Sequence, residues 1–481
     1  MEEVKKRVLF WFRRDLRLED NVGLYHALKN SDMVAPIFIF DKEILDSLPS
    51  QDKRLVFIWQ AIKSLRQELR ELGSDLIVRY SYAKTEIPLL AKKFKVDAVY
   101  CNEDYEPQAR QRDNSIKEVL NKIGINFVSF KDSVIFAKKE ILNSQGQIYT
   151  SFTSYKKSWE KELIKENYQL VDIYSYKHKF SQFKIRDEIL LEDFGFKNVQ
   201  SNKLEISNNG AKKIFDKFKN KMLPHYKTLR DFPSISGVSY LSTYNRFGLI
   251  SIRYLVSQIK ALIAVSDKKR AENAQAWLDE LIWREFYMQL LYNYPRIAYE
   301  PFRPEYKYLN WDNNFYYFQL WCEGKTGYPI IDAAMKQLNE TGYMHNRLRM
   351  IVSSFLCKTL LIDYRVGEEY FALKLLDFDL SANNGGWQWA ASTGVDNVNY
   401  IRFFNPTKQS EKYDNEARFI KKQLPLFKNV PSKYLHEPWL YENELKDCGI
   451  ILGKDYPHPI VDYETKRKEA LKMYEEINKF N

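Results

Sequence analysis

Residues 8–12 read Val-Leu-Phe-Trp-Phe, a short apolar run that predicts a β-strand buried on both faces. Four more apolar, β-prone runs follow it, at 33–40, 76–80, 96–101 and 127–130. A helical pattern lies among them, because leucine and isoleucine recur at three- and four-residue steps from Leu55 to Leu72, and Gly73 gives a stop signal. Strands that alternate with helices predict an N-terminal α/β domain with a doubly wound parallel sheet.

The turn after the first strand is rich in charge and poor in glycine. It reads Arg-Arg-Asp-Leu-Arg-Leu at 13–18, and no G-x-G-x-x-G or G-x-x-x-x-G-K-[ST] loop accompanies the predicted sheet. A dinucleotide or nucleotide site of the usual glycine-rich kind is therefore not supported in this domain.

The chain then changes character twice. Residues 132–205 lose periodicity and mix Lys, Ser, Asn and Gln with aromatics, which predicts a connector that wraps the two halves. From residue 206 to 481 the pattern is mostly helical, with a last helix expected near 462–479. The predicted organisation is an α/β domain (1–131), a connector (132–205) and a larger all-helical domain (206–481).

Composition narrows the class of protein without naming its function. The 481 residues include 15% aromatics, and 74 basic against 63 acidic residues give a net charge of +11. This surplus suits a polyanionic partner such as nucleic acid, although a solvated lysine-rich surface explains it equally well. The cysteines lack metal-ligand or redox spacing, so no metal site is expected at Cys101, Cys322, Cys357 and Cys448.

The sequence carries no recognisable targeting signal. The N-terminus lacks the long apolar region and the small-residue cleavage site of a signal peptide, and no run of 18 apolar residues occurs. We therefore expect no membrane contact and a cytoplasmic, reducing location.

The first segment that is unlike ordinary core is Trp-Leu-Asp-Glu-Leu-Ile-Trp-Arg-Glu-Phe-Tyr at 277–287. Glu280, Trp283 and Arg284 fall at i, i+3 and i+4, so one helical face carries an acid, an indole and a guanidinium. The alternative is an exposed Glu280–Arg284 pair beside a core tryptophan.

The second segment begins at Gly342 and is expected to continue as a helix to Ile362. One helical face is apolar, with Met344, Leu348, Ile351 and Phe355. The opposite face is suited to touch something polar, flat or anionic, and it holds Asn346, Arg349, Met350 and Ser353. A second protein contact surface is the alternative.

The third segment, at 377–389, reads Asp-Phe-Asp-Leu-Ser-Ala-Asn-Asn-Gly-Gly-Trp-Gln-Trp. Its amides and carboxylates can bind the edge of a heterocycle, its indoles can stack or carry electrons, and its glycines allow close approach or positive φ. Asp377 and Asp379 could instead form an acid/base pair, or pair in charge with Arg349. The residues alone predict a ligand-filled helical domain with an aromatic, polar pocket.

These segments, together with Trp-Phe-Arg-Arg-Asp-Leu-Arg-Leu-Glu-Asp-Asn at 11–21, closely resemble the photolyase/cryptochrome family. Further matches lie at 230–233, 324–329 and 404–406. The helix around 344–350 is most similar to class I photolyases of cyclobutane pyrimidine dimers, because (6-4) photolyases and animal cryptochromes usually carry a His pair there. The resemblance implies a monomeric, light-dependent lyase that binds UV-damaged DNA.

The resemblance also implies FAD, active as FADH⁻, which when excited gives an electron to a thymine dimer and later regains it. It assigns FAD contacts to Tyr226, Ser239, Tyr240, Leu241, Ser242, Trp277, Arg284, Arg349, Asp377, Asp379 and Asn383. Within this set, Arg349 and Asp377 match a salt bridge beside the flavin, and Asn383 matches the amide that faces flavin N5.

The lesion is assigned to further matched positions. Contacts with the dimer or the DNA backbone fall to Arg230, Glu280, Trp283, Asn346, Arg347, Met350, Trp389 and Arg402. Flavin photoreduction usually runs through three tryptophans, matched here by Trp387, Tyr364 and Trp311. Tyrosine is harder to oxidise without losing its proton, so the middle Tyr364 predicts slower or rerouted photoreduction.

The antenna chromophore and the exact activity stay open. Ala109 stands where folate-binding relatives often have Glu, so a methenyltetrahydrofolate antenna is doubtful, and a deazaflavin, a second flavin or no antenna remain. A cryptochrome-type blue-light receptor is the rival hypothesis, disfavoured because Asn383 is retained where plant cryptochromes usually have an acid, and because no long extension follows. A (6-4) photolyase is a further alternative, and a light-independent DNA-binding protein would explain the charge but not the cluster at 377–389.

Overall fold

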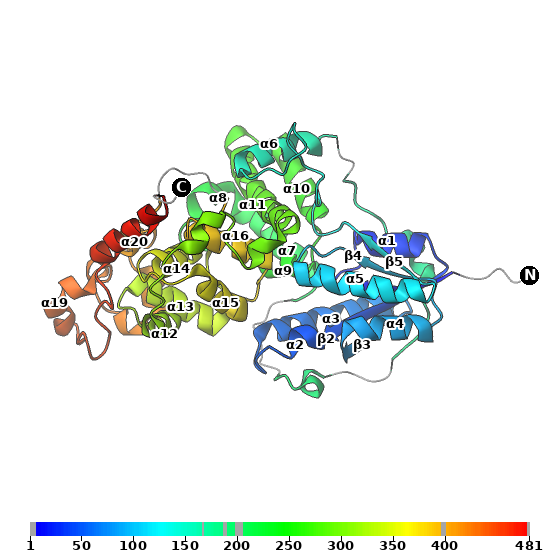
Figure 1. Cartoon of the computed structure of the whole chain (residues 1–481), viewed down its shortest axis with the longest axis horizontal. Helices are drawn as coiled ribbons and strands as arrows, with labels where there is room; N and C mark the ends of the chain where they lie inside the picture. Colours follow the sequence, from blue (N-terminus) through cyan, green and yellow to red (C-terminus); the bar gives the residue numbers. More distant parts are fainter. Residues whose placement is uncertain (1–5, 166–167, 186–189, 198–204, 396–400, 479–481) are drawn as a thin grey trace, which may run out of the picture. The chain divides into compact units, whose positions relative to one another are not determined.

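The computed structural model describes residues 6–165, 168–185, 190–197, 205–395 and 401–478 of the chain. It contains two compact units (Figure 1). The first comprises Met1–Pro224 and Ser239–Pro295, and the second comprises His225–Val238 and Arg296–Asn481. The boundaries expected at residues 131 and 205 stay a prediction.

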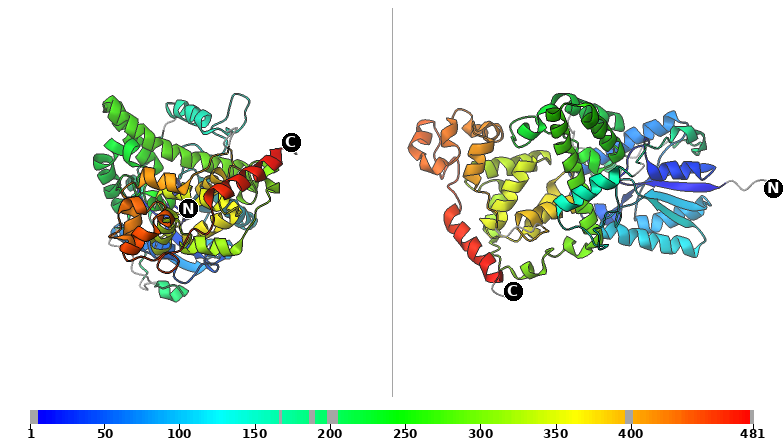
Figure 2. Two further views of the ribbon diagram at one scale, coloured as in Figure 1. Left: turned by 90° about the vertical axis from the view of Figure 1, so that its left-hand side faces the viewer. Right: turned by 90° about the horizontal axis from the view of Figure 1, so that it is seen from above.

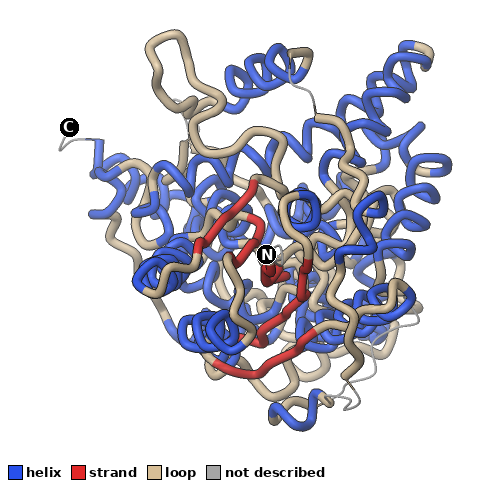
Figure 3. Tube along the Cα trace, turned by 90° about the vertical axis from the view of Figure 1, so that its right-hand side faces the viewer, coloured by secondary structure: helices blue, strands red, loops and turns tan. Residues whose placement is uncertain are grey.

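The first unit is built around a five-stranded parallel sheet with the strand order β3-β2-β1-β4-β5. Its strands are β1 (Arg7–Phe12), β2 (Met33–Asp41), β3 (Ile77–Ser81), β4 (Ala98–Asn102) and β5 (Asn126–Phe130). Figure 3 shows these strands side by side with helices around them. All five predicted strands are present, and the expected doubly wound sheet is confirmed.

Helices cover both faces of this sheet. Leu9 and Trp11 of β1 pack in one buried cluster with side chains of α4 (Ala83–Lys93) and α5 (Pro107–Lys122). Phe10 points the other way, toward Gly23 of α1 (Val22–Lys29). Burial on both faces holds for β1, β2 and β4, whereas the edge strands are less buried: β3 is partly exposed and β5 is half-exposed.

The remaining helices of the first unit include one that the sequence did not predict. They are α2 (Lys42–Leu45), α3 (Lys53–Glu71), α6 (Phe152–Leu163), α7 (Asn208–Lys221), α9 (Ser242–Arg246), α10 (Ile252–Val265) and α11 (Lys268–Asn293). Helix α3 has the predicted pattern, and Gly73 after it adopts a positive φ of 79°. Helix α6 lies in the predicted connector at 132–205, where no helical periodicity was recognised, so these twelve residues were not predicted as a helix.

A buried carboxyl group joins α6 and the segment before it to α11. Glu285 of α11 accepts hydrogen bonds from the backbone N–H groups of Ile135 (2.6 Å) and Phe136 (3.0 Å). It also accepts one from the indole of Trp159 in α6 (2.6 Å). Burial raises the pKa of Glu285 to about 7, while these donors act in the opposite direction. The segment from residue 132 to 163 is therefore held to α11 by polar contacts inside the unit.

The second unit is helical in all of its described residues that form regular structure, as the sequence predicted. Its helices are α8 (Tyr226–Leu229), α12 (Phe315–Glu323), α13 (Pro329–Thr341), α14 (Asn346–Lys358), α15 (Tyr364–Lys374), α16 (Leu380–Ala390), α17 (Pro406–Tyr413), α18 (Arg418–Gln423), α19 (Glu442–Asp447) and α20 (Tyr463–Asn478). Figure 2 shows them from two further sides. Short 3-10 turns complete both units, at Tyr174–Lys179, Leu191–Phe194, Leu223–His225, Pro295–Ala298, Pro304–Tyr308, Pro425–Phe427, Ser432–Tyr434 and Pro438–Leu440.

One large core holds this unit together, and α13, α14, α15 and α16 contribute to it. Met344 is buried as expected but precedes α14, because His345 is the N-cap; the helix ends at Lys358, four residues before the predicted end. None of the helices in the described residues has the length and apolar character needed to span a bilayer.

Candidate functional site

The centre of the candidate site in the second unit is an ion pair between α14 and the residues before α16. Nη2 of Arg349 lies 3.0 and 2.9 Å from the two carboxylate oxygens of Asp377. Its Nε donates to the backbone oxygen of Met344 at 2.9 Å. The Asp377 side chain is 7% exposed and that of Arg349 is 28% exposed. One side of the guanidinium is thus fixed while part of it stays accessible.

Asp379 caps a helix, whereas Asp377 forms an ion pair with Arg349. It is the N-cap of α16, and its Oδ1 accepts hydrogen bonds from the backbone N–H groups of Ser381 (3.1 Å) and Ala382 (3.2 Å). Such a cap satisfies N–H groups that have no partner within the helix. The segment at 377–389 is therefore largely a capped helix, and its two acids are not arranged as a single acid/base pair.

The accessible face of α16 carries small side chains. Ala382 and Gly386 are exposed, and Asn383 between them is half-buried. A Cβ built on Gly386 would meet no atom within 4 Å. Gly386 is helical rather than left-handed, so of the two uses expected for glycine it can serve only close approach. This face leaves room for a flat ligand.

The amide of Asn383 has a defined orientation. Its Nδ2 donates to the backbone oxygen of Glu368 in α15 at 3.0 Å, so Oδ1 is the end that remains to accept. Behind it, Nδ2 of Asn384 donates to Glu368 Oε1 (3.2 Å) and to the backbone oxygen of Ile297 (2.8 Å). Burial raises the pKa of Glu368 to about 8. Glu368 and Asn384 were missed in the sequence, although their buried polar character next to Asn383 could have marked them.

Trp387 lies on the buried face of α16 and packs in the core of the second unit. Its ring lies 5.0 Å from Phe371 and 6.2 Å from Trp321, centroid to centroid. The backbone of α15 presses on its edge, because a Cβ on Gly367 would lie 2.2 Å from Trp387 Cη2. The indole N–H has no hydrogen-bond partner among the described residues.

The other two positions expected for electron transfer differ from each other. Tyr364 begins α15 and is buried, and its hydroxyl finds no hydrogen-bond partner in the described part of the chain. Trp311 is half-buried and meets Tyr474 of α20 edge to face at 6.4 Å. The ring contacts of the described residues do not join Tyr364 to Trp387 or to Trp311.

In the first unit, the predicted helix at 277–287 is part of α11. Trp277 is buried against Phe215 (5.6 Å) and Phe218 (5.3 Å) of α7, as ordinary core. Glu280 and Arg284 are half-buried. Nη1 of Arg284 donates to the backbone oxygen of Ser133 at 2.7 Å.

Trp283 has a partner that the sequence did not predict. Phe152, the first residue of α6, stacks on its ring at 3.6 Å with the planes 8° apart. Phe286 and Tyr287 pack around the same indole. Phe152, Tyr155 and Trp159 form a narrow aromatic stripe at helical spacing, which Leu163 extends, and this stripe is the signal that could have revealed α6.

The predicted phosphate segment, residues 239–242, precedes and begins α9. Ser239 Oγ accepts from the backbone N–H of Leu241 at 3.4 Å, and Ser242 is the first residue of the helix. Tyr240 between them is exposed and adopts φ of 57°, which is uncommon for any residue except glycine. The turn therefore holds its backbone in a strained but specific shape.

The residues expected near DNA are placed unequally. Asn346 and Met350 share one face of α14, with Nδ2 and Sδ 4.0 Å apart. The Arg230 guanidinium lies 5.3 Å above the Tyr226 ring. Arg347 forms an ion pair with Asp231 at 2.8 Å, so its charge is partly neutralised within the unit.

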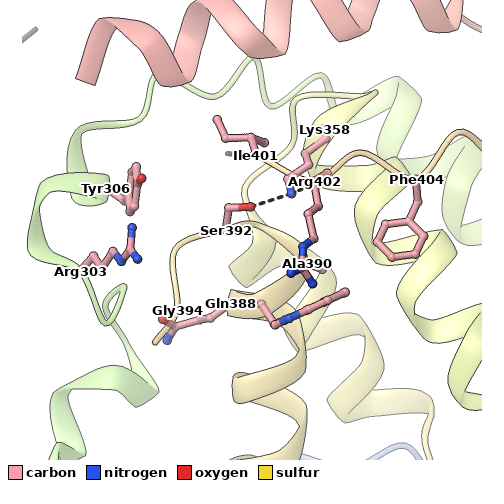
Figure 4. Close-up of a pocket in the computed structure, with 11 residues that line it drawn as sticks. Arg303, Tyr306, Lys358, Gln388, Ala390, Ser392, Gly394, Ile401, Arg402 and Phe404 are labelled. Atoms are coloured by element: carbon pink, nitrogen blue, oxygen red, sulfur yellow. Dashed lines mark hydrogen bonds between the residues drawn. The ribbon is translucent and has the colours of Figure 1, made fainter. Parts of the chain in front are cut away.

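A pocket of about 30 Å³ adjoins the end of α16 (Figure 4). It is lined by the expected lesion residues Trp389 and Arg402, and by Lys358, which was missed. Nζ of Lys358 donates to Ser392 Oγ (2.7 Å) and to the backbone oxygen of Arg402 (2.6 Å). Burial lowers the pKa of Lys358 to about 7. Lys358 therefore links Ser392, which follows Trp389 at the end of α16, to the backbone of Arg402.

Family models match most of the chain. Residues 8–171 match a model described as DNA photolyase, and residues 277–476 match the FAD binding domain of DNA photolyase. Among curated relatives, a deoxyribodipyrimidine photo-lyase of Vibrio cholerae is 37% identical and covers 97% of this chain and 98% of its own length. The one from Escherichia coli is also 37% identical, with 98% and 99% covered.

Solved structures agree over the whole length. A class III photolyase from Agrobacterium tumefaciens has a TM-score of 0.87 at 29% identity, covering 100% of this chain and 99% of that one. An archaeal photolyase from Sulfolobus tokodaii, solved with two FAD molecules, has 0.80 at 34% identity, with 98% and 100% covered. A Synechocystis cryptochrome has 0.88 at 26% identity, also with 98% and 100% covered.

Proposed function

Because the chain belongs to the DNA photolyase family, we propose that it is a light-dependent DNA-repair enzyme that splits cyclobutane pyrimidine dimers with FAD as its cofactor. Its activity is that of a deoxyribodipyrimidine photo-lyase, which breaks carbon–carbon bonds. The observation that carries the assignment of the site is the oriented Asn383 amide on the same unit as the Arg349–Asp377 pair.

The side chains present fit reduced FAD. Asn383 Nδ2 is held by the backbone oxygen of Glu368, so Oδ1 accepts, and reduced flavin carries a hydrogen on N5 to donate. The half-buried cation of Arg349 favours the anionic reduced form over its neutral acid. When bound, reduced and excited by light, FAD supplies the electron that opens the dimer. The chain's part is to hold the flavin, fix its protonation and exclude water.

The proposal extends to the other positions that the resemblance assigns to FAD. They are Tyr226, Ser239, Tyr240, Leu241, Ser242, Trp277, Arg284 and Asp379. Backbone N–H groups of a strained turn suit phosphate oxygens, and the Tyr240 φ of 57° supports this use of residues 239–242.

For the lesion, we assign Glu280 to the edge of the dimer bases and Trp283 to a stacking face. Phe152 already holds the plane of Trp283, so the indole needs little reorganisation on binding. On the second unit, Asn346, Met350 and Trp389 are assigned to the same lesion. Moving the dimer out of the duplex stack costs a few kcal/mol, and this cost is smaller for a damaged base pair than for an intact one.

The DNA backbone is assigned to Arg230, Arg347 and Arg402. Phosphate contacts of this kind are blind to sequence and weaken as salt rises, because bound counterions are released. The net charge of +11 fits such binding. A second, antenna chromophore is open among a deazaflavin, a flavin and methenyltetrahydrofolate. The monomeric state and cytoplasmic location stay predictions.

Repair of a defined lesion tests the proposal. The protein, loaded with FAD and reduced with dithionite, is mixed with an oligonucleotide carrying one thymine dimer and exposed to blue light, with a (6-4) lesion as control. We expect repair of the dimer only. A flavin-bound protein that repairs neither lesion would favour the cryptochrome hypothesis, and repair of the (6-4) lesion alone would favour a (6-4) photolyase.

A single substitution tests the assigned pocket. Glu280→Ala should lower the repair yield by about 10-fold, which corresponds to about 1.4 kcal/mol, while FAD stays bound. Unchanged repair would refute the role given to Glu280.

A further inference from the structure

Trp387 has two ring neighbours in the described part of the chain, and they differ in redox chemistry. Phe371 is closer, at 5.0 Å, but a phenyl ring is far harder to oxidise than an indole. Trp321 of α12 lies 6.2 Å away at an interplanar angle of 69°. Electron tunnelling falls steeply with distance, so Trp321 is the best-placed donor to an oxidised Trp387.

Hydrogen bonding favours a positive charge on Trp321 over one on Trp387. Nε1 of the fully buried Trp321 donates to the backbone oxygen of Val352 at 3.1 Å. Loss of an electron makes an indole N–H more acidic and strengthens such a bond. The N–H of Trp387 is buried without a partner among the described residues, so its oxidised form lacks this stabilisation. An electron therefore moves downhill from Trp321 to oxidised Trp387.

Two tyrosines nearby differ in where their proton could go. The Tyr364 hydroxyl is buried with no acceptor in the described residues, and burial raises the pKa of both Tyr364 and Tyr370. Tyr370 is half-buried and lies 5.7 Å from Trp321, and its hydroxyl donates to Asn339 Oδ1 at 2.6 Å. Oxidation of a tyrosine is coupled to loss of its proton, so Tyr370 is the better donor.

We propose that photoreduction of the flavin runs through Trp387, Trp321 and Tyr370, and bypasses Tyr364. This inference rests on the proposed function. With oxidised FAD bound and excited by light, Trp387 would give it one electron. Trp321 would then reduce Trp387, and Tyr370 would reduce Trp321. The hydroxyl proton of Tyr370 passes to solvent. A thiol in the buffer returns one electron and one proton to Tyr370.

The test is transient absorption and steady photoreduction of the FAD-loaded, oxidised protein under blue light with added thiol. Trp321→Phe should lower the yield of long-lived radical at least 10-fold. Trp439→Phe is the matched control, because Trp439 is partly buried in the same core without a ring contact to Trp387, and it should keep the yield within 2-fold.

The outcomes separate the two hypotheses. If reduced wild-type protein repairs no dimer, the proposed function fails. If it repairs the dimer, but Trp321→Phe gives the wild-type radical yield and spectrum, the route is wrong. If Trp321→Phe does not fold, as judged by FAD content, Tyr370→Phe replaces it; loss of the tyrosyl radical signal supports the route, and an unchanged signal overturns it.

Discussion

Gly367→Ala tests how tightly α15 holds the Trp387 indole. A Cβ at this position would lie 2.2 Å from Trp387 Cη2 and 2.5 Å from Leu356 Cδ2. Carbon atoms in ordinary contact are about 3.5–4.0 Å apart, so the ring or the helix has to move by more than about 1 Å. Overpacking of this kind costs about 1–3 kcal/mol, and alanine gains about 1 kcal/mol over glycine in a helix. With three atoms closer than 2.6 Å, we expect a net loss of about 2 kcal/mol in the free energy of unfolding.

The matched control is Gly386→Ala in the neighbouring helix α16. A Cβ there would meet no atom within 4 Å, so only the helix propensity changes, and the chain should gain up to about 1 kcal/mol. Both variants are compared with the wild type in the FAD-free form, by urea unfolding followed by circular dichroism, because Gly386 lies on the face proposed for the flavin. If Gly367→Ala is as stable as Gly386→Ala, the packing of Trp387 against α15 is not as tight as described.

Three further predictions concern the site. Arg349→Ala leaves the Asp377 carboxylate without its partner, so the affinity for FAD, measured by flavin fluorescence, should fall about 10- to 100-fold. Unchanged affinity would show that this ion pair is not part of the FAD site. Folding lowers the pKa of Lys358 from 10.5 to about 7, so the unfolded chain binds the extra proton between these values and stability should rise with pH by up to ~5 kcal/mol. In urea unfolding from pH 7 to pH 10, the free energy of unfolding of Lys358→Met should rise less with pH than that of the wild type. Equal rises in the two proteins would contradict a lowered pKa of Lys358. Phe152→Ala removes a stacked pair that contributes about 0.5–1.5 kcal/mol and should weaken binding of dimer-containing DNA by about 2- to 10-fold in a gel-shift titration, with FAD content unchanged; full affinity would show that Trp283 needs no support.

The sheet could be predicted from the sequence because its strands are short apolar runs separated by clear helical patterns. Every predicted strand is present, with boundaries that shift by at most two residues. Helix α6 was missed because lysines surround its apolar positions, so its narrow aromatic stripe did not stand out from an irregular segment. The position of β5 at the edge of the sheet could not be predicted either, because the order of the strands depends on which strands pair and not on the sequence of a single strand.

The candidate site was predictable by residue type but not by contact. Arg349 and Asp377 are 28 residues apart, and only the folded chain places their side chains within 3.0 Å. Asp379 resembled a second catalytic acid, yet the start of α16 uses it as a cap. Lys358 is the last residue of its helix, where a lysine usually complements the helix dipole in solvent, so its burial could not be inferred from the sequence.

The hydrogen bonds of Glu285 bear on whether the chain can be divided into working modules. A fragment that begins at residue 206 would keep this carboxyl group on α11 but would lose its donors at Ile135, Phe136 and Trp159. A buried acid without donors is costly, so such a fragment should fold poorly even though it contains every residue assigned to FAD. Grafting the flavin-binding half of this enzyme onto another protein therefore calls for a cut before residue 132, with the connector retained as part of the graft.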